Sequence, residues 1–257
     1  MLLTQGLVYQ NTPWEQHGGI WVKREDLCCA QGGPKFSKVR GLVDHFLKLR
    51  PKQPIGVLDT VHSKAGWAAA WVAKHLEMPC YNFHPGTVRR GQERSRSLGA
   101  HLISLQPGRS AILWYRARKI LAEITEGEGY LLPNGLQLEE SIDATAKEVR
   151  EHTSKNLWGG TWIVSASTGT LARGVYEGLS GRAELVVHMG YSRAHSTLYK
   201  RIGSDIQLVD EGYSYKDAVD FPCPFPCNPF YDLKAWKWAI ANLQTLRPPV
   251  VFWNIGS

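Results

Sequence analysis

The sequence predicts an α/β protein built on open, twisted and mostly parallel sheets with helices on both faces. Apolar stretches of strand length alternate with helical stretches along most of the chain, a pattern typical of parallel sheets. Apolar residues make up 43% of the chain and charged residues 21%, which is a globular composition. The 257 residues suffice for one large domain or for two lobes. Ligands of such sheets bind at the carboxyl ends of the strands.

The predicted elements follow one another in a regular order. Strands are expected at residues 20–27, 55–61, 79–85, 101–107, 161–167, 184–190, 205–212 and 250–257. Helices are expected at 64–76, 89–100 and 110–124, and a last helix begins at Asp232. The periodicity of the third helix places on its inner side Ile112, Tyr115, Ile120 and Ile124. The proline-rich segment 221–230 is expected to be rigid, irregular chain.

Charge and cysteine content bound the class of protein. There are 30 basic residues and 23 acidic ones, a formal net charge of +7, and such a surface attracts carboxylates, phosphates and nucleic acid. No run of eighteen apolar residues occurs, which excludes a conventional membrane helix, and the first ten residues lack the features of a signal peptide. Five cysteines, an odd number, predict no disulfide framework, so we expect a cytoplasmic protein.

Common nucleotide and metal motifs are missing from the sequence. There is no Gly-x-x-x-x-Gly-Lys-Ser/Thr run, and no spaced-glycine turn follows the first strong strand. These absences argue against a P-loop ATPase and against a dinucleotide-binding enzyme. Cys28-Cys29 and the pair Cys223 and Cys227 are spaced poorly for zinc, so we expect no metal.

The segment that follows the first strand carries a lysine pattern. The strand IWVKREDL leads into the glycine-rich turn GGPKFSKVRGL at 32–42. This segment resembles the fold type II (tryptophan-synthase-β-like) family of pyridoxal-phosphate (PLP) enzymes, nearest the branch of 1-aminocyclopropane-1-carboxylate deaminase and D-cysteine desulfhydrase. The resemblance implies that Lys38, in Lys-Val-Arg, forms the Schiff base with the cofactor, and Lys35 is the alternative. A Schiff-base lysine must be able to lose its proton, which burial favours.

The segment HSKAGWAAAWVAKHLEMP at 62–79 is similar to the Ser-Asn loop of the same family and the helix after it. The resemblance implies that Ser63 holds the substrate carboxylate and assists proton transfer. Lys64 stands where the family has an asparagine that touches the phenolic oxygen of the cofactor. A cation at this position favours the phenolate or binds the substrate carboxylate, and either use changes which substrate bond is weakened.

Two further segments resemble cofactor contacts of the family. TWIVSASTGTLARGV is similar to its phosphate-binding turn, which implies contacts from Ser167, Thr168, Gly169 and Thr170. Unpaired backbone N–H groups at a helix N-terminus support this, although such a turn is also a common helix cap. NPFYDLKAWKWAI resembles a deaminase stretch, which implies that Tyr231 lies near the substrate and Asp232 beneath the pyridine nitrogen. The alternative for Asp232 is a cap of the last helix.

The resemblance also implies the domain organisation, with a large PLP-binding domain from 1–42 and 128–257 and a small domain at 43–127. Four arginines of the small domain fall within eight residues, namely Arg89, Arg90, Arg94 and Arg96. They form either a solvated helix face or an electrostatic shelf for phosphates, such as those of DNA. Further basic residues that would extend this shelf are Lys48, Arg50, Lys52, Arg193, Lys200 and Arg201.

The resulting interpretation is a PLP-dependent lyase that acts at the α-carbon of an amino-acid-like substrate through Lys38. One substrate class is an amino-acid group attached to a DNA base, decarboxylated as in compact PLP enzymes of bacteriophages that hypermodify thymine, in which case the compartment is the host cytoplasm. The other is a free small amino acid, deaminated or desulfhydrated as in the nearest relatives. A third hypothesis is an inactive PLP fold that binds nucleic acid. The family implies a homodimer, and no membrane partner is expected.

Overall fold

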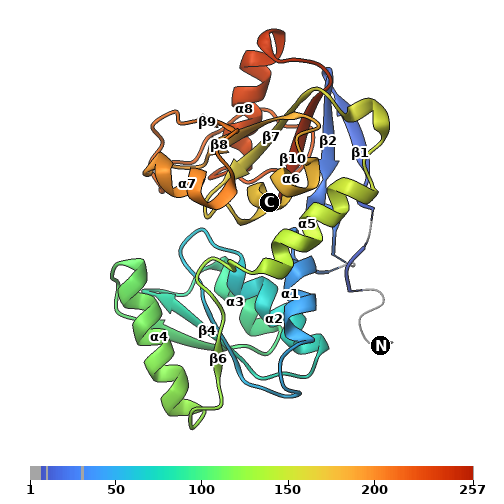
Figure 1. Cartoon of the computed structure of the whole chain (residues 1–257). Coiled ribbons are helices and arrows are strands. Elements are labelled where there is room, and N and C mark those ends of the chain that lie inside the picture. The colour runs from blue at the N-terminus through green and yellow to red at the C-terminus, as the bar shows by residue number, and fades with distance from the viewer. Residues whose placement is uncertain (1–6, 10, 30–31, 257) are drawn as a thin grey trace. The chain divides into compact units, whose positions relative to one another are not determined.

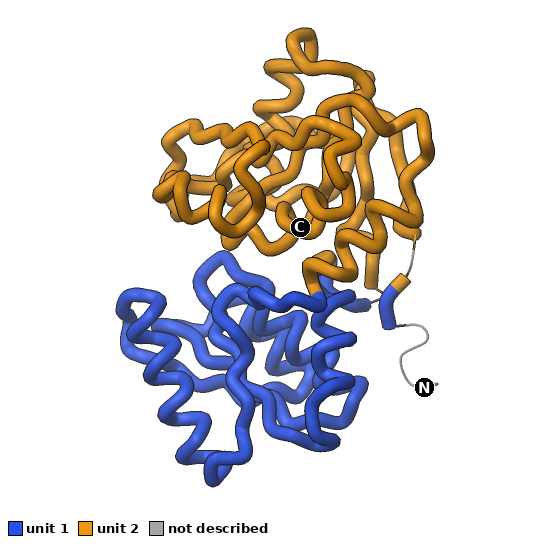
Figure 2. Tube along the Cα trace, in the orientation of Figure 1, with its two compact units in different colours: residues 1–8, 31–34, 38–140 blue, residues 9–30, 35–37, 141–257 orange. Residues whose placement is uncertain are grey.

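The structure, a computed structural model, describes residues 7–9, 11–29 and 32–256. Its chain forms two compact units: unit 1 consists of residues 1–8, 31–34 and 38–140, and unit 2 of residues 9–30, 35–37 and 141–257 (Figure 2). Unit 1 thus extends beyond the small domain expected at 43–127. Most of the first ten residues, on which the prediction of no signal peptide depends, lie outside the described residues.

Unit 1 is built on a four-stranded parallel sheet with the strand order β5-β4-β3-β6. Its elements in chain order are α1 (Val39–Phe46), β3 (Ile55–Leu58), α2 (Ala65–His75), β4 (Cys80–Pro85), α3 (Arg90–Ser97), β5 (His101–Leu105), α4 (Ser110–Ile124) and β6 (Tyr130–Leu131) (Figure 1). The predicted alternation of strands and helices is confirmed here. Because the strands are parallel, the segments that follow them leave from one edge of the sheet.

Helix α4 packs on this sheet through a face different from the predicted one. The residues buried against the sheet are Leu113, Ala117 and Leu121. The prediction of an inner side is wrong for three residues, which are 45–67% exposed, namely Ile112, Tyr115 and Ile124; Ile120 packs partly against the core. A four-residue spacing of the buried side chains sets the orientation of the helix. The periodicity alone could not distinguish two apolar stripes on one helix.

Unit 2 is built on a six-stranded sheet with the order β1-β2-β10-β7-β8-β9, in which only the β1–β2 pair is antiparallel. Its elements are β1 (Trp14–His17), β2 (Ile20–Arg24), α5 (Glu139–Glu151, whose first two residues belong to unit 1), β7 (Thr161–Ala166), α6 (Thr170–Leu179), β8 (Glu184–Met189), α7 (His195–Ile202), β9 (Gln207–Val209), α8 (Asp232–Asn242) and β10 (Val250–Asn254). Short 3-10 turns lie at Glu25–Leu27, Lys155–Leu157 and Leu243–Thr245.

Helices cover both faces of this six-stranded sheet. Along β7, Trp162 and Val164 pack in one apolar cluster with Val175 of α6. Ile163 packs in a second cluster with Trp236 of α8. Successive side chains of a strand point to opposite faces, so a strand covered on both sides is apolar throughout. Within the described residues, no helix is both long and apolar enough to cross a membrane.

Candidate functional site

Lys38 lies at the N-cap position of α1 and is a residue of unit 1. The residue is 7% exposed, and its Nζ atom donates a hydrogen bond to the carbonyl oxygen of Gly135 at 2.5 Å. Burial lowers the pKa of Lys38 from 10.5 to about 7. The alternative, Lys35, is exposed. Of the two lysines, Lys38 therefore has the environment that a nucleophilic amine requires.

Ser63 and Lys64 form the turn between β3 and α2, in the same unit. The Oγ atom of Ser63 accepts a hydrogen bond from the backbone N–H of Ala65 at 3.0 Å, and Lys64 occupies the N-cap position of α2. The Nζ atom of Lys64 is buried. The turn follows the carboxyl end of β3, where sheets of this kind bind ligands.

A buried carboxylate that the sequence analysis missed lies beneath this turn. Asp59, directly after β3, is fully buried and accepts hydrogen bonds from Nε2 of Gln92 at 2.8 Å and from Nδ2 of Asn82 at 3.4 Å. Burial raises the pKa of Asp59 to about 6, although hydrogen bonds from the Gly66 backbone and from Ser63 oppose the rise. The signal available in the sequence was a single acidic residue at the end of an apolar strand.

The turn at 167–170 joins β7 to α6 in unit 2. Gly169 is the N-cap of α6, with a φ of +86°, a conformation that favours glycine. The hydroxyls of Thr168 and Thr170 share a hydrogen bond of 2.9 Å. The first N–H groups of a helix have no partners within the helix, and they carry partial positive charge. Helix N-termini of this kind can bind anions.

Tyr231 and Asp232 lie at the start of α8, also in unit 2. Asp232 is 2% exposed and accepts a hydrogen bond from the hydroxyl of Ser165. Tyr231 is half-buried, and a Cβ added at Gly190 would lie 2.6 Å from its ring. Burial and the neighbouring Tyr215 raise the pKa of Tyr231, so its hydroxyl keeps its proton at neutral pH. Tyr231 is therefore a hydrogen-bonding group rather than a base.

The four predicted arginines lie in unit 1: Arg89 just before α3, Arg90 as its first residue, and Arg94 and Arg96 in its last turn. Three are exposed, namely Arg89, Arg90 and Arg96, while Arg94 lies over the ring of Trp67 at 4.3 Å. The backbone N–H of Arg89 donates to Oε1 of Gln92, whose amide holds Asp59. A Cβ added at Gly91 would lie 3.7 Å from the carbonyl oxygen of Ser63. The first turn of α3, which begins at Arg90, is thus adjacent to the Ser63 turn.

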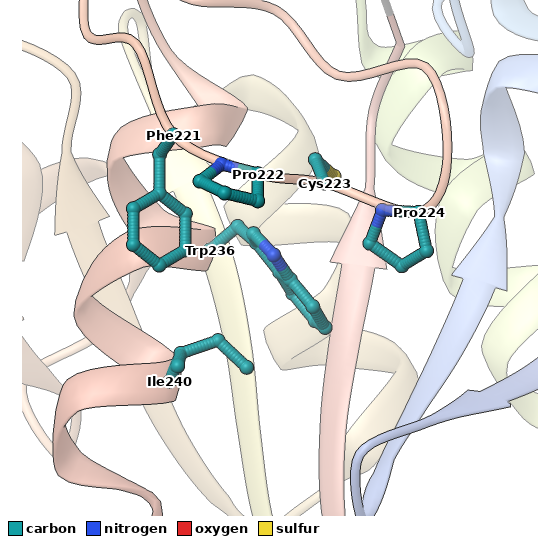
Figure 3. A pocket seen from close by; sticks show the side chains of 6 residues that line it. All are labelled: Phe221, Pro222, Cys223, Pro224, Trp236 and Ile240. Atoms are coloured by element: carbon teal, nitrogen blue, oxygen red, sulfur yellow. The ribbon is translucent and has the colours of Figure 1, made fainter.

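A separate pocket of about 480 Å³ lies in unit 2 (Figure 3). Its lining comes from the proline-rich segment and α8, namely Phe221, Pro222, Cys223, Pro224, Trp236 and Ile240. Phe221 and the two prolines close it from one side, and Trp236 and Ile240 of α8 from the other (Figure 3). None of the predicted site residues lines it, so it is not the predicted site.

The predicted site residues fall into two sets, one in each unit. Unit 1 carries the buried amine of Lys38 with the turn of Ser63 and Lys64. Unit 2 carries the turn at 167–170 together with Asp232. By their chemistry, an amine with a pKa of about 7, a helix N-terminus with a glycine cap and a buried carboxylate suit, respectively, the aldehyde, the phosphate and the ring nitrogen of PLP. The residues present therefore fit this cofactor.

Comparison with known proteins gives a relative along nearly the whole chain. The protein named glycyl-dTMP PLP-dependent decarboxylase, from Pseudomonas phage M6, is 44% identical over 279 aligned positions, which cover 97% of this chain and 100% of the relative.

Solved structures share the fold. An ACC deaminase homologue superposes with a TM-score of 0.81 at 17% identity, over 99% of this chain and 93% of its own. O-acetyl serine sulfhydrylase isoform 3 from Entamoeba histolytica superposes with a TM-score of 0.73 at 16% identity, over 99% of this chain and 87% of its own. The predicted fold type II architecture is thereby confirmed.

Residues 7–220 match the family described as "Pyridoxal-phosphate dependent enzyme". This match covers most of the chain, and the phage relative extends the similarity to nearly all of it. The chain therefore belongs to the family of pyridoxal-phosphate-dependent enzymes, and its cofactor is pyridoxal 5'-phosphate.

Proposed function

We propose that this enzyme is a decarboxylase whose substrate is an amino-acid group carried by a thymine nucleotide. The relative from Pseudomonas phage M6 is named for decarboxylation of glycyl-dTMP, and its 44% identity over almost the entire chain supports the same reaction class. In the structure, the observation that carries the proposal is the buried amine of Lys38, whose pKa is about 7. If the enzyme is encoded by a phage, its nucleotide substrate places it in the cytoplasm of the host. Assembly into a homodimer stays a prediction.

Lys38 is the residue that we assign to proton transfer and to covalent attachment of the cofactor. The cofactor, when bound, supplies an electron sink for the electron pair left on the α-carbon. At neutral pH a large fraction of the Lys38 amine is unprotonated, since burial lowers its pKa to about 7. It can accept a proton from the substrate ammonium group and later donate one to the α-carbon, after the carboxylate has left as carbon dioxide. Hydrogen replaces the carboxylate, and no oxidant or reductant is required.

Ser63 and Lys64 are assigned to the substrate carboxylate. The choice among the three bonds at the α-carbon depends on which one is held perpendicular to the cofactor ring. A cation at position 64 binds the substrate carboxylate by charge and fixes its orientation before carbon dioxide leaves, whereas the asparagine of the deaminase branch carries no charge. The burial of the Lys64 Nζ atom strengthens such a charge interaction. This difference favours decarboxylation over the deaminase reaction.

The unit 2 residues are assigned to the cofactor. The turn formed by Ser167, Thr168, Gly169 and Thr170 binds the phosphate through backbone N–H groups and hydroxyls. Asp232 binds the protonated ring nitrogen, which deepens the electron sink. Tyr231, which keeps its proton, orients the substrate by hydrogen bonding.

We also propose that the substrate group is presented on DNA, with its phosphates contacting Arg89, Arg90, Arg94 and Arg96. The start of α3 lies beside the Ser63 turn, so a base whose amino-acid group reaches Ser63 brings its neighbouring phosphates to this helix. Exposed arginines bind phosphates by charge and by paired hydrogen bonds. The stacking of Arg94 on Trp67 holds one guanidinium in place.

The test is an assay of purified holoenzyme on three substrates: a thymidine nucleotide carrying a glycyl group, an oligodeoxynucleotide carrying the same group, and free amino acids. Mass spectrometry should show loss of carbon dioxide from the nucleotide substrates. Lys38→Ala should abolish the reaction, and Lys35→Ala should leave it intact. Release of ammonia from a free amino acid, with no change in either nucleotide substrate, would instead assign the enzyme to the deaminase class.

A further inference from the structure

Two arginines of unit 2 contact the turn at 167–170 on its carbonyl side. Nη1 of Arg193, in the loop between β8 and α7, donates a hydrogen bond to the carbonyl oxygen of Ser167. Nη1 of Arg201, on α7, donates to the carbonyl oxygen of Thr168 at 2.9 Å. Consecutive peptide groups of the turn therefore each accept a hydrogen bond from a guanidinium.

The arginines contact the carbonyl side of the turn, and this determines their effect on its N–H groups. In a trans peptide the C=O and the N–H point in opposite directions. The N–H groups that belong to these two peptides are those of Thr168 and Gly169, and they point away from the arginines. A charged donor on a carbonyl polarises the peptide and makes its N–H a stronger donor. The arginines thus strengthen the N–H donors of the turn and leave the N–H side open to a ligand.

Further contacts hold the guanidinium of Arg193 in its position beside the turn. Its guanidinium lies over the ring of Tyr191 at 4.8 Å, and Nη2 donates to the Tyr191 hydroxyl at 2.5 Å. The residue is half-buried, so the interaction with Ser167 is screened less than on an open surface. Gly169 packs against α7 through Leu198, whose Cδ2 would be 3.2 Å from an added Cβ, so the turn and the helix of Arg201 are in direct contact.

We infer that Arg193 and Arg201 are positioning residues for the cofactor phosphate, which they serve by fixing and polarising the peptides of the 167–170 turn. The inference rests on the proposed role of that turn. It places two positive charges near the doubly charged phosphate of the cofactor. From the sequence alone, Arg193 and Arg201 were expected only to extend a basic surface. Their contacts with the turn are to the carbonyl oxygens of Ser167 and Thr168, so we expect their effect to be specific to the phosphate.

The experiment compares the affinity of the cofactor-free enzyme for pyridoxal phosphate and for pyridoxal, which lacks the phosphate. Arg193→Met and Arg201→Met should each weaken pyridoxal phosphate binding by about 3- to 10-fold, the range for loss of one ordinary hydrogen bond, because each arginine acts on the phosphate only through a peptide of the turn. Pyridoxal binding should change less than about twofold. Arg201→Lys, which keeps the charge, should restore part of the affinity. Arg173→Met is the matched control, because Arg173 lies on α6 and pairs with Glu177 at 2.7 Å.

The outcomes separate this inference from the assignment of the turn. Equal weakening of both ligands in the arginine variants would overturn the inference, since a general loss of structure affects both. Thr168→Val and Thr170→Val report on the turn itself. If they remove the preference for the phosphate while the arginine variants keep it, the turn is the phosphate site and the arginines do not support it. If neither set alters the preference, the assignment of the turn is wrong and the inference falls with it.

Discussion

The hydroxyl of Ser165 donates a hydrogen bond to Oδ1 of Asp232, and both residues are buried. Ser165 lies near the end of β7, and Asp232 is the first residue of α8, so the bond fixes the carboxylate to the strand that leads into the 167–170 turn. An acidic residue in the first turn of a helix is also favoured by the helix dipole. The hydrogen bond therefore orients the carboxylate, and the helix dipole stabilises its charge.

Asp232→Asn should lower kcat by about 100-fold, as expected when a preorganised charge at a reacting centre is removed. The amide cannot hold a proton on the ring nitrogen as a carboxylate does. Ser165→Ala should have a smaller effect, about 10-fold, because it frees the carboxylate without removing its charge. Steady-state kinetics and the absorption spectrum of the bound cofactor provide the measurement.

Asp143→Asn is the control for these variants, because Asp143 is an exposed carboxylate on α5. If Asp232→Asn retains full kcat and an unchanged cofactor spectrum, Asp232 serves only as the first acidic residue of the helix.

Lys38→Met should stabilise the cofactor-free protein at pH 7, by on the order of 4 kcal/mol. The pKa of Lys38 is lowered from 10.5 in the unfolded chain to about 7 in the fold. Between these values the unfolded state binds more protons, so the stability of the wild-type protein rises with pH. The difference between variant and wild type should therefore be greatest below pH 7 and shrink towards pH 10.5. Urea unfolding at several pH values measures it, and a pH-independent difference would contradict the lowered pKa.

The sequence predicted the elements better than it predicted their contacts. Alternating strands and helices follow from local apolar patterns, which is why the fold type and the position of Asp232 at the start of a helix could be predicted. The wrong face of α4 and the missed Asp59 have another cause: burial there depends on partners distant in the chain, such as Phe83 and Gln92. The resemblance placed Lys38, but only the fold showed that Lys38 is buried while Lys35 is exposed.

Gly66→Ala should destabilise unit 1 by about 2–4 kcal/mol, in the range of a severe steric or hydrogen-bond defect. A Cβ at Gly66 would lie 2.1 Å from Nδ2 of Asn82 and 2.5 Å from Oδ2 of Asp59, so the buried network under the Ser63 turn must shift. Thermal unfolding and the KM for substrate should both respond.

Gly91→Ala gives a matched control in the same unit. Its added Cβ would lie 3.7 Å from the nearest atom, an ordinary contact, and alanine is the better helix former. This variant should be unchanged or more stable by about 0.5–1 kcal/mol. Equal destabilisation by both substitutions would show that the Asp59 network does not require the glycine.

Replacing Arg89 and Arg90 by glutamine should weaken binding of the enzyme to DNA in a salt-dependent manner. Each phosphate contact contributes a slope of about one to the dependence of log affinity on log salt, so the double variant should lose about two. Fluorescence anisotropy with an unmodified oligodeoxynucleotide at several salt concentrations measures this slope.

Arg118→Gln, at an exposed position on α4, removes the same kind of charge elsewhere in unit 1 and should leave the slope nearly unchanged. An identical slope in the wild-type protein and the Arg89/Arg90 variant would show that these arginines form only a solvated helix face.

Lys64→Met should lower kcat for decarboxylation more than it raises KM. The cation orients the carboxylate, so its loss leaves a smaller fraction of the bound substrate with the carboxylate bond perpendicular to the cofactor ring, and the rate of the chemical step falls. Lys64→Arg keeps the charge and should retain more of the rate than Lys64→Met. Lys64→Asn restores the residue of the deaminase branch and should give the lowest ratio of carbon dioxide released to substrate α-proton exchanged.

The proton-exchange measurement distinguishes a role in choosing the bond from a role in folding. Incubation in deuterated water reports α-proton exchange even when decarboxylation is slow, because proton transfer by Lys38 does not require the carboxylate to leave. A misfolded Lys64 variant loses both reactions together. A variant in which exchange persists while carbon dioxide release fails has lost only the orientation of the carboxylate, since the amine that moves the proton still works. Retention of the wild-type ratio in Lys64→Asn would remove Lys64 from the choice of bond.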